Sequence, residues 1–392
     1  MKEKIKAFVK NSKIIYAGYN LLGSAFFRVL GLFVRQDKNL VLFASYGGRK
    51  FDDSPRVVYE YLQKNDESAE RKYVWAFVEP EKYPEVENKV KIDTWAFYIT
   101  ALKAKYWITN SSVARGLNFK KRNNRNILFT HGLTALKRIG TDVLDKKEIF
   151  VSKPNEKFDL VFVEGKQEST ILANVWNLDE TVFRATGLPR NDDLVDFLPE
   201  EVTAIKQRLG IPRNKKVILY APTFRDDTRS EDGRNALRIP IDFEKWEKYL
   251  GEEYVLLINA HYVVAKFLDE LPKNHFVINA FGYPVLNDLL KVADILISDY
   301  SSIVFDYSIL ERPILCYGYD CDAYLAMRGS YIDIHSFFCD GIIRDEDVLL
   351  NTIATLDYAV ESQFTRENIK EKYLASYGNA AEKAVEIIFS EK

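Results

Sequence analysis

From residue 36 onward the chain alternates between short apolar runs and amphipathic stretches. Continuous apolar runs of four to eight residues, each followed by a helical pattern, are typical of parallel strands buried on both faces. We predict strands at Asn39–Ser45, Lys72–Val78, Tyr106–Thr109, Arg125–Thr130, Phe158–Val163, Lys216–Ala221, Tyr254–Ala260, Phe276–Asn279, Ala293–Ser298 and Pro313–Tyr317. The pattern therefore indicates an α/β fold.

A seam near residue 195 divides this alternation into two halves. A helix predicted at Leu198–Gly210 is broken by Ile211–Asn214, after which strands and helices alternate again. Two helices, Asp345–Ala359 and Thr365–Ile388, are expected to close the chain. Doubly wound sheets bind ligands beyond the carboxyl ends of their strands, so we expect the site between the two halves.

The first 35 residues differ from the rest in charge. They hold seven basic residues and one acidic residue, a net charge of +6, and Arg28 is the only charged residue from Ile14 to Val34. We favour a basic, aromatic-rich helix that lies in the interface of an anionic membrane. A membrane-spanning helix and an ordinary packed helix are the alternatives. Arg28, Asn20 and three glycines argue against the spanning helix.

Composition narrows the function classes. The chain has 55 Lys and Arg against 57 Asp and Glu residues, so no chain-wide basic field favours nucleic acid as a partner. Three cysteines are too few for a disulfide framework and fit a reducing cytosolic setting. Four histidines make a histidine-rich metal site improbable, and no P-loop or dinucleotide-binding glycine motif occurs. We therefore expect neither a metal nor a cofactor.

Two of the four histidines stand directly after predicted strands, one in each half. His131 follows a strand of the first half, and His261 follows a strand of the second. A single histidine in this position often only satisfies local hydrogen bonds, but a pair that faces the same space favours acid–base or electrostatic chemistry. His275 and His335 lack such a setting, so we interpret them as structural.

Other polar side chains stand at the same strand ends. Ser301 and Ser302 precede a short apolar run, and Asp306 lies one helical turn further on. Serine hydroxyls and free helix N–H groups suit a phosphate, and a carboxylate suits polyol hydroxyls. A simple helix cap is the alternative for the serines, and a surface salt bridge is the alternative for Arg190. Three further candidates stand at a strand exit or at the seam: Thr223, Arg225 and Arg190.

Taken together, these segments resemble the CDP-glycerol glycerophosphotransferase family of teichoic-acid and capsule synthesis. The resemblance covers roughly residues 40–335, and its most specific segment is Ser298–Tyr307 (SDYSSIVFDY). Further segments match in the family's order: Thr130–Gly132 with Leu136–Gly140, Thr186–Asp192, Leu219–Asp226 and Arg312–Leu315. The spacing between His131 and Lys137 is one residue longer than in many polymerising members and is nearest to the primase branch.

The resemblance implies a GT-B architecture, with two Rossmann-like doubly wound domains facing a cleft. Residues 36–195 would then form the acceptor domain and residues 196–392 the CDP-donor domain, preceded by a membrane-associating helix in residues 1–35. The implied reaction transfers glycerol phosphate from CDP-glycerol to a hydroxyl of a lipid-linked saccharide or polymer, releasing CMP. It would take place at the cytoplasmic face of the cell membrane, with the enzyme as a peripheral membrane protein and without a cofactor.

The resemblance also assigns site residues. His131 matches the proposed base, and His261 matches a second motif histidine associated with the donor phosphates. The other matching positions bind substrate: Gly132, Lys137, Arg190, Thr223, Arg225, Ser301, Ser302 and Asp306. Departures from the family pattern around His261 and after Tyr331 leave the donor polyol and the acceptor open, with CDP-ribitol as the alternative donor.

Two competing functions follow from the same sequence. One is a GT-B glycosyltransferase or epimerase that uses a UDP-sugar in the same cleft. The other is a membrane-bound, nucleotide-binding scaffold of a polymer-export complex, which binds its ligand without turnover. The scaffold gives no reason for the two strand-end histidines.

Overall fold

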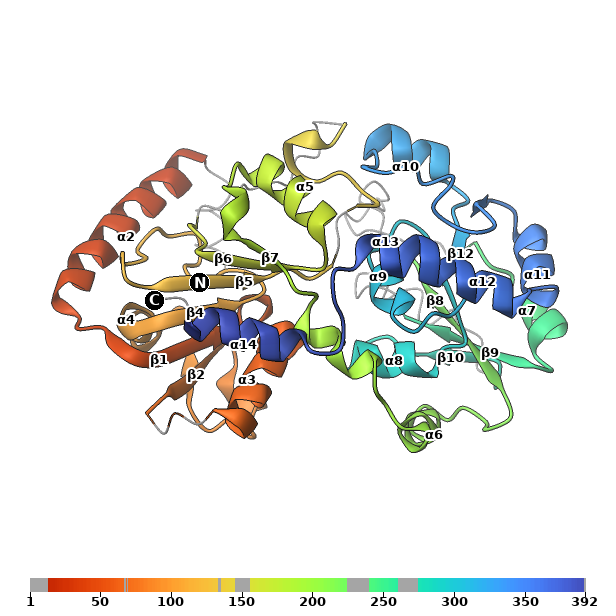
Figure 1. The fold of residues 1–392 in the computed structure, drawn as a ribbon, viewed down its shortest axis with the longest axis horizontal. Helices are drawn as coiled ribbons and strands as arrows, with labels where there is room; N and C mark the ends of the chain where they lie inside the picture. Colours follow the sequence, from red (N-terminus) through yellow and green to blue (C-terminus); the bar gives the residue numbers. More distant parts are fainter. Residues whose placement is uncertain are drawn as a thin grey trace.

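Two parallel β-sheets, which lie side by side in Figure 1, organise the computed structural model. The structure describes residues 13–66, 68, 70–132, 135–144, 156–223, 240–259 and 274–390. Every strand of the first sheet precedes every strand of the second along the chain. The α/β fold with parallel sheets is therefore confirmed.

The first sheet has seven parallel strands in the order β3-β2-β1-β4-β5-β6-β7. These are β1 (Asp37–Ala44), β2 (Lys72–Phe77), β3 (Lys89–Lys91), β4 (Ala104–Thr109), β5 (Arg125–Phe129), β6 (Leu160–Val163) and β7 (Phe183–Ala185). Its main helices are α3 (Asp53–Asn65), α4 (Trp95–Lys103) and α5 (Lys166–Trp176). The strand order reverses between β1 and β4, and open α/β sheets bind ligands beside such a switch point.

The second sheet repeats this order with six strands, β10-β9-β8-β11-β12-β13. These are β8 (Lys216–Ala221), β9 (Tyr254–Ile258), β10 (Val277–Asn279), β11 (Ile295–Ser298), β12 (Ile314–Tyr317) and β13 (Ile342–Ile343). Its helices are α6 (Pro199–Arg208), α7 (Phe243–Leu250), α8 (Leu286–Val292), α9 (Ile303–Ser308), α10 (Cys321–Met327) and α11 (Glu346–Ala354). The switch point of this sheet lies between β8 and β11.

Burial explains why the strands could be found in the sequence. Val41, Leu42 and Phe43 of β1 are fully buried although their side chains alternate between the two faces of the sheet. Leu42 pairs with Val74 on one side and with Trp107 on the other. Helices therefore cover both faces, which requires a continuous apolar run. All ten predicted strands are present. The pattern missed β3, β7 and β13, which have only two or three residues each.

The end of the chain differs from the predicted Thr365–Ile388 helix. It forms α12 (Tyr358–Phe364), a π-helical turn (Thr365–Lys370) and α13 (Glu371–Tyr373), and after a break it forms α14 (Ala380–Ser390). The break lies where the chain crosses back to the first sheet, because the Ala375 N–H donates to the Glu164 carbonyl at 2.9 Å. Both carboxylate oxygens of Asp192 then accept the first N–H groups of α14 at 2.8 Å.

Helix α14 packs beside α3 of the first half, as Figure 1 shows. Its Ala384 and Ile388 belong to the same buried cluster as Val41 and Phe43 of β1. The two sheets are thus tied together by two chain crossings, one before α6 and one after α13.

Helix α2 (Lys13–Phe33) lies along the outer side of the first half in Figure 1. Its Phe27 stacks on Tyr98 with ring centroids 4.1 Å apart, and Leu30 packs against the same cluster of buried residues. The buried Ser24 hydroxyl accepts the Asn118 N–H at 2.8 Å. One face of this helix is therefore packed against the protein. Among the described residues, no helix is both long enough and apolar enough to cross a membrane.

We predict that Gly165→Ala destabilises the fold at the return crossing. A Cβ atom at this position would lie within 3.0 Å of the Tyr373 carbonyl oxygen, a backbone atom that cannot rotate away. We expect the free energy of unfolding in urea to fall by about 1–3 kcal/mol. Gly18→Ala is the control, because no atom lies within 4 Å of a Cβ there and alanine favours a helix. A Gly165→Ala variant as stable as the wild type would contradict this close crossing.

Candidate functional site

The candidate site begins at the carboxyl end of β5. The Thr130 N–H donates to the Phe162 carbonyl of β6 at 3.1 Å, so the ladder continues one residue beyond the strand. His131 is the next residue, and its side chain reaches solvent. Its neighbour Gly132 is buried, with a φ of +136° that L side chains rarely adopt.

Gly132 brings the loops of the two sheets together. A Cβ atom on Gly132 would lie within 3.0 Å of the Ser302 side chain and 3.7 Å from Nη2 of Arg190. Position 132 therefore has room only for the hydrogen atom of glycine. Because Ser302 follows β11, this close contact joins a loop of the first sheet to a loop of the second. The arrangement places His131 from the first half beside the Ser301–Ser302 segment of the second.

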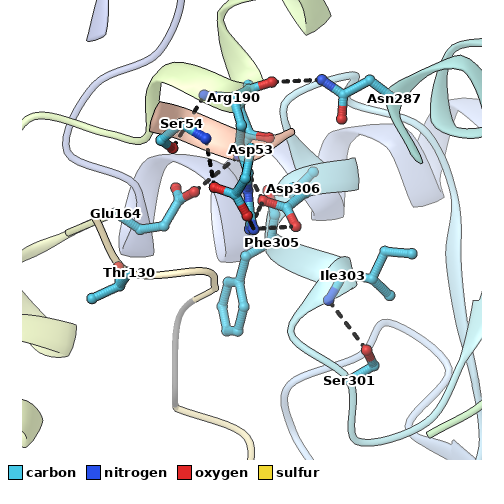
Figure 2. A network of polar contacts seen from close by, with 12 residues as sticks. Asp53, Ser54, Thr130, Glu164, Arg190, Asn287, Ser301, Ile303, Phe305 and Asp306 are labelled. Atoms are coloured by element: carbon cyan, nitrogen blue, oxygen red, sulfur yellow. Dashed lines mark hydrogen bonds and ion pairs between the residues drawn. The ribbon is translucent and has the colours of Figure 1, made fainter. Parts of the chain in front are cut away.

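Arg190 links the two halves through ion pairs, which Figure 2 shows. It lies in the 3₁₀ turn Pro189–Leu194, and its Nη2 contacts both carboxylate oxygens of Asp306 at 2.8 and 2.9 Å. Its Nη1 lies 3.5 Å from Oδ2 of Asp53, at the start of α3. Asn191 donates to Asp306 at 2.6 Å and to Glu164 at 2.9 Å. Acidic groups from both sheets thus converge on one guanidinium.

Asp53 is a buried carboxylate that sequence reasoning missed. Its Oδ2 accepts the Tyr46 hydroxyl at 2.6 Å, and its Oδ1 accepts the Ser54 N–H at 2.6 Å. Burial raises the pKa of Asp53, but Arg190, these hydrogen bonds and the proximity of His131 outweigh burial and hold it below its ordinary value. Asp53 is therefore a buried anion at neutral pH, with a positive φ of 65°.

Two further carboxyl groups lie beneath the strand ends. Glu164 directly follows β6, and burial and the nearby Asp306 raise its pKa well above the ordinary value. Glu168 in α5 accepts the Glu164 N–H at 2.9 Å, and burial raises the pKa of Glu168 to about 8. Among the described residues its Oε1 has no hydrogen-bond partner. Like charges in a dry region disfavour ionisation, so Glu168 holds a proton at neutral pH and the ionised form of Glu164 is disfavoured.

The electrostatic surroundings of His131 favour the neutral imidazole. Although His131 reaches solvent, protein atoms packed around the imidazole remove part of its hydration and lower the pKa of His131, and the positive charges of Arg190 and Lys137 lower it further. Asp53 and a hydrogen bond with the Asn110 backbone act in the opposite direction, and the net effect is a pKa below the ordinary value. A neutral imidazole near pH 7 has the lone pair that a general base requires.

The second sheet contributes its own strand-end residues. Asp299, after β11, accepts hydrogen bonds from the Thr223 N–H at 2.9 Å and from the Thr223 hydroxyl. These bonds hold the residues that follow β8 against the residues that follow β11. Ser301 accepts the Ile303 N–H at 3.4 Å, whereas Ser302, at the N-cap of α9, makes no side-chain cap bond. These residues lie at the switch point of the second sheet.

The structure brings most of the sequence-predicted residues together. His131, Gly132, Arg190, Ser302 and Asp306 form one contact between the halves, and their roles toward a substrate stay predictions. Lys137 is half-buried on the loop beyond Gly132. His261 and Arg225 lie outside the described residues. Among the residues that the structure does describe, one group could share a metal ion, and it contains no residue of this site: Cys339, Asp340 and Glu361.

Comparison with known proteins adds an independent line of argument. A family model described as CDP-Glycerol:Poly(glycerophosphate) glycerophosphotransferase matches residues 25–390. The chain is 28% identical to the teichoic acid glycerol-phosphate transferase of Staphylococcus aureus, over 99% of this chain and 100% of that protein. It is 30% identical to the teichoic acid poly(glycerol phosphate) polymerase of Bacillus spizizenii, over 98% of this chain and 99% of that protein. The chain is also 33% identical to the teichoic acid poly(glycerol phosphate) polymerase of Staphylococcus epidermidis. This match covers 75% of this chain but only 42% of that protein.

Solved structures agree with the sequence comparison. The wall teichoic acid polymerase TagF superposes with a TM-score of 0.83 and 28% identity, over 100% of this chain and 98% of that one. A further structure of that polymerase was obtained after a soak with CDPG. The UDP-GlcNAc 2-epimerase of Neisseria meningitidis, at 14% identity and a TM-score of 0.54, shares the fold alone.

We predict that Glu168→Gln changes the pH dependence of folding stability. Between about pH 4.5 and about pH 8 the folded chain keeps a proton on Glu168 that the unfolded chain releases. Stability should therefore fall as pH rises, by at most about 1.4 kcal/mol per pH unit from this group. Glutamine cannot ionise, so the free energy of unfolding of Glu168→Gln, minus that of the wild type, should rise between pH 5 and pH 8 in urea titrations. The same difference at both pH values would contradict a buried, protonated Glu168.

Proposed function

Because the chain belongs to the CDP-glycerol:poly(glycerophosphate) glycerophosphotransferase family, we propose that it transfers glycerol phosphate from CDP-glycerol to a hydroxyl of a membrane lipid-linked acceptor. CMP is the leaving group, and the product belongs to teichoic-acid or capsular-polymer synthesis. The observation that carries the proposal is the contact of the His131–Gly132 loop with Ser302. It supports a base from one half acting beside an anion-binding segment of the other.

In this mechanism the acceptor hydroxyl attacks the phosphorus atom that bears the glycerol. A hydroxyl is a weak nucleophile, and a positioned base contributes typically about 10²–10⁴-fold. His131 takes the proton in our proposal, because its exposed imidazole stands at the strand end and its lowered pKa keeps it neutral near pH 7. The phosphorus–oxygen bond to CMP then breaks.

Charge on the transferred group and on CMP requires stabilisation by groups already in position. Ser302 offers a hydroxyl beside Gly132, with Ser301 directly before it in the chain, and Nη2 of Arg190 borders the same glycine. Because Arg190 and Asp306 are paired with each other, we propose that they act on the donor as a pair, with the arginine supplying positive potential. The Thr223–Asp299 hydrogen bonds fix the loop on the opposite side of the switch point.

A ribitol-phosphate donor is the second candidate. The chain is 31% identical, over 59% of its length, to the teichoic acid ribitol-phosphate polymerase TarK of Staphylococcus aureus. Mass spectrometry of products from CDP-glycerol, CDP-ribitol and UDP-sugars, each offered with synthetic lipid-linked acceptors, separates these functions. A mass increase of one glycerol phosphate supports the first, and hexosamine transfer would overturn both polyol-phosphate proposals.

The membrane face of the proposed enzyme is α2. Its inward residues pack on the first half, while Leu21 and Leu22 are 72% exposed and Leu32 and Phe33 are 82% exposed. Trp95, at the start of α4, is 57% exposed beside Phe26, with ring centroids 6.2 Å apart, and extends this apolar surface. The residues before Lys13 lie outside the described part. We propose that this face rests on the cytoplasmic side of an anionic membrane as a peripheral contact.

We predict that His131→Ala lowers transfer from CDP-glycerol by at least about 10²-fold while CDP-glycerol still binds, because the base acts on the acceptor. Product mass spectrometry measures turnover, and calorimetry measures donor affinity. His335→Ala is the matched control, since His335 lies outside the site. Near-normal turnover of His131→Ala would remove His131 from the role of base.

We predict that replacing Leu21, Leu22, Leu32 and Phe33 together by glutamine weakens sedimentation with anionic liposomes. These side chains point away from the protein, so the fold should survive their replacement. Deleting the whole helix would instead remove Phe27 and Leu30 from their packing. The control replaces Leu198 and Tyr249, which are similarly exposed on the second half. Unchanged sedimentation of the α2 variant would place the membrane contact elsewhere.

A further inference from the structure

The guanidinium of Arg190 places Asp53 close to His131. Its Nη1 lies 3.5 Å from Asp53, and its Nη2 would lie 3.7 Å from a Cβ atom on Gly132, the residue after His131. Among the described residues, Asp53 is the one buried carboxylate of the first half that Arg190 contacts, and this contact is longer than the contact of Arg190 with Asp306. The guanidinium lies 3.5 Å from Asp53 but 2.8 Å from Asp306. A single positive charge is thus shared by two buried carboxylates, and Asp53 holds the smaller share.

Among the described residues of this group, the two carboxylates Asp53 and Asp306 face the single cation Arg190, so the group carries a net negative charge. Burial raises the pKa of Glu164 beside them and disfavours a further negative charge there. A net negative charge fixed in a region with little water stabilises a cation that forms nearby. The imidazolium that appears when His131 accepts a proton is such a cation.

We propose that Asp53 is a positioning residue, whose buried carboxylate stabilises the protonated form of His131 during transfer and which Tyr46 and Arg190 hold in place. The proposal rests on His131 acting as the base. The Tyr46 hydroxyl bond of 2.6 Å and the Ser54 N–H bond of 2.6 Å fix the carboxylate, and the Asp53 side chain is almost completely buried. A carboxylate fixed in this way is already oriented when the proton arrives, as electrostatic stabilisation requires.

Other charges around His131 oppose or assist Asp53. Arg190 from the turn before α6 and Lys137 from the loop after β5 disfavour the imidazolium, and the Asn110 carbonyl after β4 favours it. Tyr46 is hydrogen bonded to Asp53, and its N–H is bound to the Asn110 side chain at 2.7 Å, so the first switch point connects these groups. Removing Asp53 takes away the carboxylate that favours the imidazolium, while Arg190 and Lys137 still disfavour it.

The test is Asp53→Asn, read by NMR titration of the His131 imidazole and by the pH profile of transfer. Asparagine tolerates the positive φ of 65° and keeps one side-chain oxygen, which can accept either the Ser54 N–H or the Tyr46 hydroxyl, so the variant loses the charge and one acceptor. We expect the His131 titration and the acidic limb of kcat to move to lower pH by about 0.5–1 unit. We also expect kcat at neutral pH to fall about tenfold or more, with little change in the KM for CDP-glycerol. The His131→Gln spectrum assigns the resonance.

Two variants separate charge from structure. Asp52→Asn neutralises the adjacent carboxylate, which caps α3, and should leave the His131 titration unchanged. Tyr46→Phe removes the hydroxyl bond but keeps the Asp53 charge, so it should move the titration less than Asp53→Asn. An unshifted His131 titration in Asp53→Asn overturns the proposal, as does an equal shift in Asp52→Asn. If the wild type shows no transfer, the proposed function fails, while the NMR titration still decides whether Asp53 acts on His131.

Discussion

The buried ion pairs of Arg190 hold the contact between the two sheets in one arrangement. Its guanidinium joins Asp53 at the start of α3 to Asp306 in α9, across the loops that carry His131 and Ser302. Burying such charges is itself costly, but removing one partner from an existing buried pair costs about 3–5 kcal/mol. The pairs therefore act mainly by excluding other relative positions of the strand ends. The distance between the proposed base and the proposed phosphate segment follows from that constraint.

The same region carries more acid than base, which explains how it is tuned. With Arg190 occupied by two carboxylates, burial raises the pKa of both Glu164 and Glu168 and disfavours further negative charge. Asn191 donates to Glu164 and to Asp306 with one nitrogen and so lies between these two carboxyl groups. An environment with fixed hydrogen bonds and little water makes each remaining charge effective over a longer distance than in solvent.

The sequence pattern could predict the fold because both sheets are covered on both faces. Each central strand then reads as a continuous apolar run, whereas the short edge strands β3, β7 and β13 leave no such signal. The break before α14 was missed because a long-range contact determines it: the Glu164 carbonyl accepts the Ala375 N–H. The helical periodicity of residues 365–388 does not indicate that this contact with Glu164 exists.

The sequence predicted part of the candidate site as well. Strand ends identified His131 and Ser302, and the same rule applied to β1 and β6 would have identified Tyr46 and Glu164, which follow those strands within two residues. Asp53 lies nine residues after β1 among other acidic residues, and only its burial distinguishes it. Whether Arg190 pairs with a carboxylate or with a phosphate depends on the tertiary arrangement, which residue type alone does not encode.

The proposed membrane face and the proposed base both lie in the first half of the protein. Phe27 and Leu30 of α2 pack in the same cluster as Trp107 of β4, and the residue that follows β4, Asn110, hydrogen bonds with the backbone of Tyr46 and with His131. The proposed membrane face and the proposed base thus belong to one packed unit. A hydroxyl on a lipid-linked acceptor and the His131 imidazole would then share one frame set by the bilayer. The proposed donor segment at Ser301–Ser302 belongs to the other sheet and meets that frame where Gly132 and the Arg190 ion pairs join the halves.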